Sequence, residues 1–276
     1  MSNDLFRYHL DKYRTNGRSP ERKSKVISIA SGKGGVGKTF FSTNFAKFLD
    51  SKKRKVLLID CDVYLSNCYL SLGVTPGKDL FDLHDGELFH NCVTKVGGID
   101  LISGRSGNEH KEDVDYVKTI LSLVQSLEYS YDYILLDCPA GIDSKILSLM
   151  AYCDERIVLM NPNKYSLTDA YSLIKTLRLN YGVKEFKTVT NRSDNLLAEK
   201  EINERLTNTC MTFLPDVRIK NIGSISRLDN HITNEAERIS LRNNLCNIFE
   251  FFNDKEATDS EFYLQKGLEM EFQVTF

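Results

Sequence analysis

The sequence predicts an α/β protein with three α-β-α layers built around a mostly parallel, twisted sheet. Short apolar, β-branched segments alternate with longer segments in which apolar residues recur at helical spacing. Strands that alternate with helices in this way usually form a parallel sheet covered on both faces. Polar residues directly follow several apolar segments, as at Asp60, Asp137 and Asn191. Such sheets bind ligands at the carboxyl ends of their strands, so these residues indicate where a site lies.

The predicted elements follow one another from residue 25 to residue 252. A buried strand at 25–31 precedes a helix at 40–49. Further strands are predicted at 55–60, 99–103, 131–137, 156–160 and 186–190, and further helices at 114–127, 142–151, 166–179 and 238–252. The last helix has a broad apolar face, and Arg238 and Arg242 are its only cations. This favours a final core helix over the alternative of a membrane anchor.

Composition excludes several classes of function. The chain has 276 residues and a net charge of −2, so it does not present a globally basic surface for nucleic acid. No apolar run approaches the ~18 residues of a membrane span, and the polar N-terminus does not resemble a secretory signal. The seven cysteines include no C-x-x-C pair. We interpret them as reduced packing residues of a cytosolic protein, with a metal cluster as the alternative.

One octet carries most of the chemical information. It reads Gly-Lys-Gly-Gly-Val-Gly-Lys-Thr and matches G-x-x-x-x-G-K-[ST], the phosphate-binding P-loop, between a predicted strand and a predicted helix. Inward-facing backbone N–H groups and the helix N-terminus hold phosphate oxygens. Lys38 is expected to reach the β- and γ-phosphates, and the Thr39 hydroxyl to coordinate Mg²⁺. The predicted nucleotide-binding residues here are Gly32, Lys33, Gly34, Gly35, Val36, Gly37, Lys38 and Thr39.

Acidic residues close two of the predicted strands. Asp137 ends the strand at 131–137, where a P-loop ATPase needs a Walker-B-type carboxylate. Asp60 and Asp62 follow another strand, and two carboxylates would repel a triphosphate unless a cation intervenes. We therefore expect Thr39, Asp60 and Asp137 to form a Mg²⁺ site and Asp62 to orient a water. Polar turns after the strands are the plainer alternative.

In combination, these motifs resemble the MinD/ParA family of deviant-Walker ATPases. K-G-G-x-G-K-T, D-x-D-x-x-x-x-N and D-x-P-A-G-I lie at 33–39, 60–67 and 137–142, and the likeness spans roughly 25 to 250. The resemblance implies an α-β-α P-loop NTPase that binds ATP and Mg²⁺, forms an ATP-dependent homodimer and hydrolyses ATP slowly. The implied catalytic residues are Lys33, acting in trans on the partner's phosphates, and Asp62. The implied nucleotide contacts include Asn67 and Asn191, the latter at the adenine.

Two further segments resemble the flagellar-number regulators (FlhG/FleN) of this family more than the division-site MinD proteins. They are 163–175, which contains Ser-Leu-Thr-Asp-Ala-Tyr, and the glycine-rich 97–107. Ser-Leu-Thr-Asp is also typical of a capped helix N-terminus. The likeness implies a switch for flagellar number or placement, with a signal-recognition-particle (SRP)-type GTPase, a C-ring component or a transcriptional regulator as partner. The alternatives are a ParA-like partition or other positioning ATPase, and a nucleotide-binding scaffold without turnover.

The chain departs from this branch in three places. Residues 4–10 lack the Gln-Ala of the branch's D-Q-A-x-x-L segment, so activation of a GTPase does not follow. Ser226 replaces a proline after Ile225. The tail after residue 253 holds six acidic residues and two lysines, and anionic lipid would repel it. We expect a cytoplasmic protein, with peripheral binding at the inner face of the membrane or the cell pole as a weakly supported alternative and DNA binding not expected.

We therefore divide the chain into three parts: a basic amphipathic segment and linker at 1–24, the ATPase domain at 25–252, and an acidic tail at 253–276. The first part could dock a partner, lie on a membrane or pack on its own domain. The tail ends in nine residues, 268–276, that alternate apolar and polar. That period predicts a strand that adds to a sheet edge, with a disordered tail as the alternative.

Overall fold

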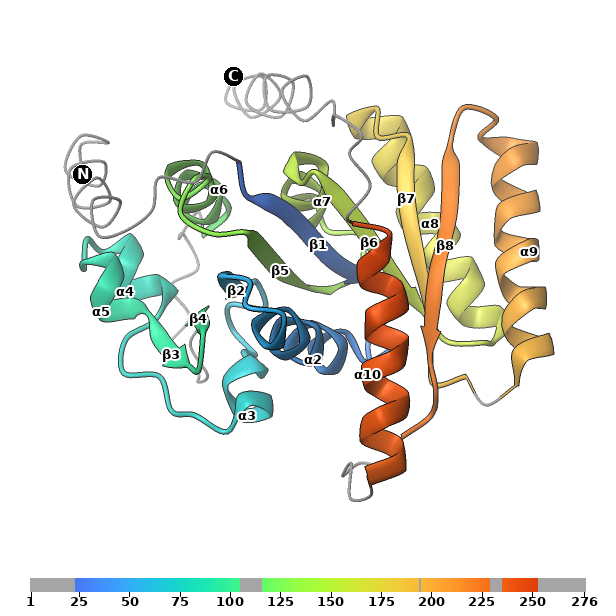
Figure 1. Ribbon diagram of the computed structural model, residues 1–276. Coiled ribbons are helices and arrows are strands. Elements are labelled where there is room, and N and C mark those ends of the chain that lie inside the picture. The colour runs from blue at the N-terminus through green and yellow to red at the C-terminus, as the bar shows by residue number, and fades with distance from the viewer. Residues whose placement is uncertain (1–22, 105–115, 194, 229–234, 253–276) are drawn as a thin grey trace, which may run out of the picture. The chain divides into compact units, whose positions relative to one another are not determined.

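The computed structural model describes residues 23–104, 116–193, 195–228 and 235–252 (Figure 1). The expectations for the N-terminal segment, the tail and most of the loop at 104–107 therefore lie outside the described residues. Eight strands form one sheet in the order β3-β4-β2-β5-β1-β6-β7-β8. Helices accompany the strands, and most strand pairs are parallel. The predicted α/β fold with a mostly parallel sheet is confirmed.

Most predicted elements are present within a few residues of their expected bounds. The strands are β1 (Lys25–Ser31), β2 (Val56–Asp60), β3 (Thr94–Val96), β4 (Ile99–Ile102), β5 (Tyr133–Ala140), β6 (Glu155–Met160), β7 (Glu185–Asn191) and β8 (Arg218–Ile225). The helices are α2 (Lys38–Ser51), α3 (Cys68–Leu72), α4 (Leu80–His84), α5 (Phe89–Cys92), α6 (Tyr116–Ser126), α7 (Ser144–Tyr152), α8 (Lys164–Tyr181), α9 (Leu196–Phe213) and α10 (Glu235–Glu250). The predicted elements did not include α9, α3 to α5, β3 or β8.

The described chain divides into two compact units, which we treat separately. The first unit holds residues up to 27 and 39–138, and the second holds 28–38 and residues from 139 onward. In the first unit, β2 pairs in parallel with both β4 and β5, and β3 runs antiparallel to β4. The register places Asp60 opposite Asp137. The two predicted acidic residues are therefore neighbours, but β5 continues to Ala140, so Asp137 lies inside its strand and not at the predicted end.

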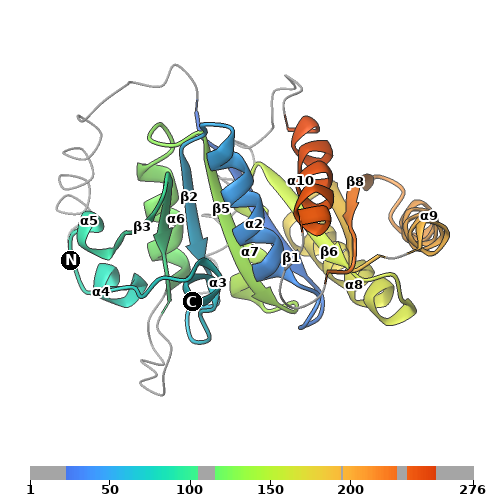
Figure 2. The same cartoon turned by 60° about the horizontal axis from the view of Figure 1, so that its bottom comes forward.

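In the second unit, β6, β7 and β8 are parallel neighbours, and Asn191 lies opposite Ile225. Figures 1 and 2 show α10 on one face of these strands and α8 on the other. The helix α10 packs on β8 and buries Leu241, Leu245, Ile248 and Phe249. The interpretation of this segment as a core helix is confirmed, because its apolar side chains pack on β8.

One helix boundary differs from the prediction. The helix α8 is capped by Asn163, whose side chain accepts a hydrogen bond from the N–H of Ser166, and it begins at Lys164. Ser166 therefore lies inside the first turn, and its hydroxyl accepts from the N–H of Asn161 at 2.9 Å. The prediction that the Ser-Leu-Thr-Asp segment caps the helix was wrong. The side-chain amide of Asn163 caps it instead, by accepting a hydrogen bond from the N–H of Ser166.

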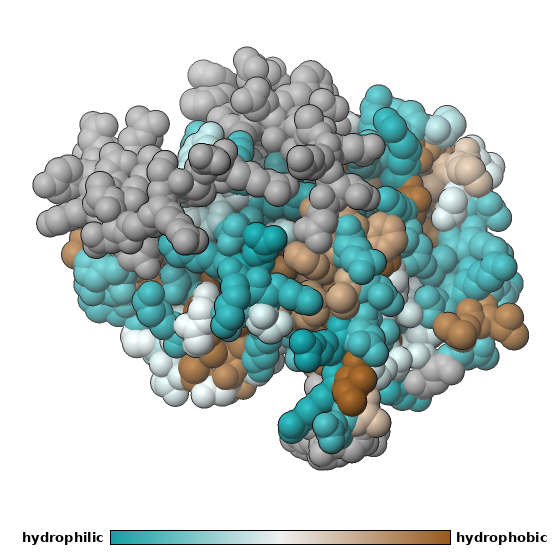
Figure 3. Space-filling model, in the orientation of Figure 1, coloured by the Kyte–Doolittle hydropathy of each residue, from teal (hydrophilic) through white to brown (hydrophobic). Residues whose placement is uncertain are grey.

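The face shown in Figure 3 is mainly hydrophilic. An apolar patch covers the lower end of α9 in that view, where Leu196 and Leu197 begin the helix and are largely exposed. No helix within the described ranges combines the length and apolar content that crossing a membrane requires.

Candidate nucleotide-binding site

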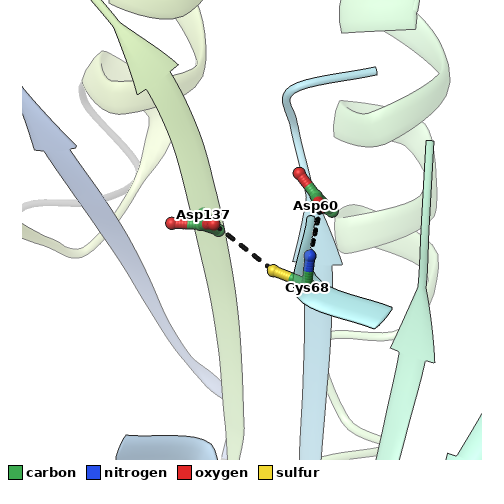
Figure 4. Close-up of side chains that lie close together, drawn as sticks. All are labelled: Asp60, Cys68 and Asp137. Carbon is green, nitrogen blue, oxygen red and sulfur yellow. Dashed lines mark hydrogen bonds between the residues drawn. The ribbon is translucent and has the colours of Figure 1, made fainter. Parts of the chain in front are cut away.

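Two carboxylates, one at the end of β2 and one within β5, form a buried cluster in the first unit. Asp60, at the end of β2, is 1% exposed, and Asp137, in β5, is 3% exposed. Figure 4 shows the Cys68 side chain directed toward Asp137, with Sγ 3.3 Å from Oδ2. The Cys68 N–H donates to Asp60 Oδ2 at 3.0 Å. The fold brings together the two predicted carboxylate ligands, Asp60 and Asp137, and adds a thiol that the sequence did not indicate.

Neutral donors hold both carboxylates in place. The hydroxyls of Thr39 and Ser42, on α2, donate to Asp137 at 2.7 and 2.8 Å. Asp60 accepts from the Ser66 hydroxyl at 2.6 Å. Burial raises the pKa of Asp137 to about 6, and the nearby Asp60 carboxylate adds to the shift while the hydroxyls oppose it. Two buried carboxylates and a threonine hydroxyl fit Mg²⁺, a hard cation that prefers oxygen ligands and would offset their repulsion.

The segment between β2 and α3 is tied to Asp60 by its backbone. The N–H groups of Asp62 and Asn67 donate to the Asp60 carboxylate at 3.1 and 2.9 Å. The Asn67 side chain is exposed, and its amide donates to the Leu65 carbonyl at 2.6 Å. The structure thus places Asp62 and Asn67 beside the cluster, while the water-orienting and nucleotide-binding roles stay predictions.

The glycine loop begins in the second unit, directly after β1. Lys38 Nζ donates to Ser31 Oγ at 3.2 Å, and that hydroxyl donates to the Lys33 carbonyl at 2.6 Å. The Lys38 ammonium is therefore held at the start of its own loop. Gly37 has φ +99°, a left-handed conformation that favours glycine. A Cβ on Gly32 would lie 2.2 Å from the Asp169 carbonyl oxygen, so this position has no room for a side chain.

The last residue of β7 and the residue after it hold the same loop. Asn191 Nδ2 donates to the Val36 carbonyl at 2.7 Å, and Arg192 donates to the Gly35 carbonyl at 3.2 Å. Arg192 has φ +57°, which is uncommon for a residue with a side chain. Asn191 thus contacts the phosphate loop itself, and its adenine contact stays a prediction. No sequence pattern indicates the Arg192 contact.

Lys33 differs from the other charged groups of the loop because its side chain is exposed. Its ammonium lies 5.9 Å from the ring centroid of Tyr165, near the start of α8, and that ring is 77% exposed. The ammonium can therefore reach a ligand outside this chain. Tyr165 was not predicted as a site residue, and a lone aromatic at a helix start gives no signal.

The sheet, the glycine loop and the buried carboxylates define a P-loop nucleotide-binding protein of the α/β class. The family model described as AAA domain matches residues 24–187. The chain is 31% identical over 206 residues to Antiactivator FleN of Pseudomonas aeruginosa, covering 73% of each chain. It is 33% identical over 156 residues to Flagellum site-determining protein YlxH of Helicobacter pylori, covering 55% of this chain and 53% of that protein.

The cell division ATPase MinD of Pyrococcus furiosus has a similar solved structure, with a TM-score of 0.61 and 26% identity. That alignment covers 91% of this chain and 99% of the other. The chain belongs to the AAA domain family, and within it to the MinD/ParA-type P-loop ATPases. The resemblance inferred from the three motifs is confirmed.

Proposed function

We propose that this protein is an ATP-dependent dimerising switch that regulates flagellar number or placement. One observation carries the switch: the buried carboxylate cluster is assembled within one chain, whereas Lys33 is exposed. A lysine that acts on the phosphates of a second copy must be able to leave its own surface. The flagellar process is supported by the likeness to FleN and to a flagellum site-determining protein.

Each residue of the site has a distinct task in this proposal. Lys38 and the loop N–H groups bind the ATP phosphates. Thr39, Asp60 and Asp137 hold Mg²⁺, which when bound neutralises phosphate charge. Asp62 orients the attacking water. Further nucleotide contacts come from Asn67 and Asn191.

Lys33 of one copy stabilises the charge that develops on the phosphates of the other copy. A cation supplied in trans accelerates hydrolysis only when two copies meet, so turnover is slow in the monomer and stimulated in the dimer. The ATP-bound dimer presents a partner surface that the monomer lacks, and hydrolysis removes it. ATP binding therefore starts an interaction and hydrolysis limits its duration.

The proposed partners are flagellar assembly proteins: an SRP-type GTPase, a C-ring component or a transcriptional regulator. The protein acts in the cytoplasm or peripherally at the inner face of the membrane or the cell pole. A ParA-like partition ATPase is the second candidate, and the solved structure of a Borrelia burgdorferi plasmid partition protein is 25% identical with a TM-score of 0.58. This second candidate function predicts salt-sensitive DNA binding that appears only with ATP.

The test uses full-length Asp62→Ala protein, which should bind ATP and accumulate as the dimer. Proteins retained from a lysate in the presence of ATP are identified by mass spectrometry. The matched control is the double variant Asp62→Ala, Lys38→Ala, which should not bind ATP and should lose the same proteins. Flagellar assembly components that depend on ATP support the proposal. Recovery of DNA and a partition adaptor alone would overturn it.

A further inference from the structure

The thiol of Cys68 has no task in the proposed ATPase reaction. It is fully buried at the start of α3, and its Sγ lies against the carboxylate of Asp137. We propose that Asp60, Cys68 and Asp137 form a site for a thiophilic divalent cation of the zinc class. This site is defined by binding alone, so it does not depend on ATP turnover.

The geometry of the three residues suits such an ion. One ligand atom from each residue lies within 4.8 Å of the other two. A tetrahedral zinc site, with Zn–S near ~2.3 Å and Zn–O near ~2.1 Å, separates its ligand atoms by about 3.5 Å. Small side-chain rotations are therefore enough to close the three ligands around one ion. A fourth position stays open for water, as in zinc sites with three protein ligands.

The ligand types favour zinc over magnesium at these atoms. Mg²⁺ is bound through oxygen, whereas a thiolate selects softer ions such as Zn²⁺. Coordination exchanges the S–H bond of Cys68 for an S–metal bond, and the proton passes to the solvent. Because Asp60 and Asp137 would be shared, Zn²⁺ and Mg²⁺ compete for the carboxylates. A thiol at residue 68 thereby makes the cluster sensitive to zinc-class ions.

The charge of the two carboxyl groups and the short segment beside them are also consistent with a bound ion. Two carboxyl groups only 1% and 3% exposed lie side by side, and a divalent cation would offset their repulsion. The carboxyl group of Asp60 is covered by a short segment, which we call the cover. It consists of residues 62–67, which lead into the five-residue helix α3. Leu65 within this cover is 69% exposed, and the side chain of Asn67 makes no capping bond to α3. Displacement of this segment gives the ion a route to the cluster.

Cobalt binding to the nucleotide-free, full-length protein tests the site, because Co²⁺ reports thiolate ligands through a charge-transfer absorption. We expect this absorption to saturate at one ion per chain and to disappear when Zn²⁺ is added. Cys68→Ser should remove it and weaken Zn²⁺ binding more than about 100-fold, since even outer-shell substitutions cost 10- to 100-fold. The matched control Cys92→Ser changes another buried cysteine, on α5, and should leave both unchanged.

Absence of the charge-transfer band in the parent protein, or its persistence in Cys68→Ser, would overturn the proposal. Circular dichroism checks the fold of each variant. If Cys68→Ser does not fold, Cys68→Ala replaces it. Asp60→Asn and Asp137→Asn keep the thiol and should also weaken Co²⁺ binding at least about tenfold. Since these titrations contain no nucleotide, their failure is distinguishable from a failure of the proposed ATPase switch.

Discussion

Asp60 and Asp137 are almost completely buried and accept hydrogen bonds from hydroxyl and backbone donors, whereas Lys33 is exposed beside an exposed tyrosine ring. The carboxylate cluster is therefore set by the packing of the first unit. A cation–π contact at an exposed site contributes only about 0.5–1 kcal/mol, so Lys33 can exchange the Tyr165 ring for a phosphate. The carboxylate cluster is thus already formed in the single chain, whereas Lys33 is available to a second copy.

Replacing Lys33 tests the group that is available to a second copy, and it should have the largest effect on ATP turnover. In Lys33→Ala, ATP binding should persist, because Lys38 and the loop N–H groups remain. Turnover at high protein concentration should fall about 10³-fold or more, as for other cations supplied in trans. Steady-state ATPase assays over a range of protein concentrations measure this effect. Lys164→Ala, a lysine near Tyr165, serves as the control, and an equal loss there would remove the special role of Lys33.

Replacing Lys38, whose ammonium is held by Ser31 at the start of the glycine loop, should weaken the binding of ATP. Lys38→Ala should weaken ATP binding by about 3 kcal/mol or more, a factor of more than about 100, because charge-assisted hydrogen bonds to phosphate are lost. Isothermal titration calorimetry measures the change. Lys47→Ala is the matched control, since Lys47 lies on α2 and donates to the Ser71 carbonyl at the surface. ATP affinity near the parent value in Lys38→Ala would contradict the assignment.

The buried cluster should leave a signature in the pH dependence of stability. Burial, and next the Asp60 carboxylate, raise the pKa of Asp137 from 3.8 to about 6, so the folded state holds this proton more tightly than the unfolded state. The free energy of unfolding should therefore decrease as pH rises from about 4 to about 6, by up to about 3 kcal/mol. Asp137→Asn should flatten this change. Urea unfolding with a chelator present measures it, and an equally steep pH dependence in Asp137→Asn would contradict the assignment.

The Tyr165 ring should have the smallest effect. Tyr165→Leu removes a contact worth about 0.5–1 kcal/mol at an exposed site, so turnover should change only a few-fold. Tyr165→Phe keeps the ring face and should behave like the parent protein. The difference in kcat between the two variants, with KM for ATP unchanged, isolates the positioning of Lys33. A large loss in both would indicate that the hydroxyl or the start of α8 matters instead.

The sequence predicted the parts of the site that depend on chain order. The neighbouring positions of Asp60 and Asp137 and the loop at 32–39 follow from motif spacing, because parallel strands present their carboxyl ends at one edge. The predicted strand end at Asp137 was wrong, since β5 continues to Ala140. Cys68 could not be predicted as a neighbour of these carboxylates. Its position depends on how the start of the five-residue helix α3 is held at Asp60, and a helix of that length has no periodicity to detect.

The missed elements have the same physical origin. The helix α9 buries only Ile202, Asn203, Leu206 and Cys210, so its apolar pattern is faint. The buried Arg156 gives no signal either, although its guanidinium donates to the carbonyls of Met150 and Ala151 at the end of α7. Such contacts depend on tertiary packing, which a local pattern does not encode.

Mixing two inactive variants tests most directly whether Lys33 acts on the phosphates of the partner copy. A Lys33→Ala chain keeps Asp62 and needs a lysine from its partner, and an Asp62→Ala chain can supply that lysine. If Lys33 acts in trans, each variant alone hydrolyses ATP poorly, and the equimolar mixture regains turnover because one site of each mixed dimer is complete. We expect this recovery in an ATPase assay of the mixture. A mixture no more active than the average of its two components would contradict it.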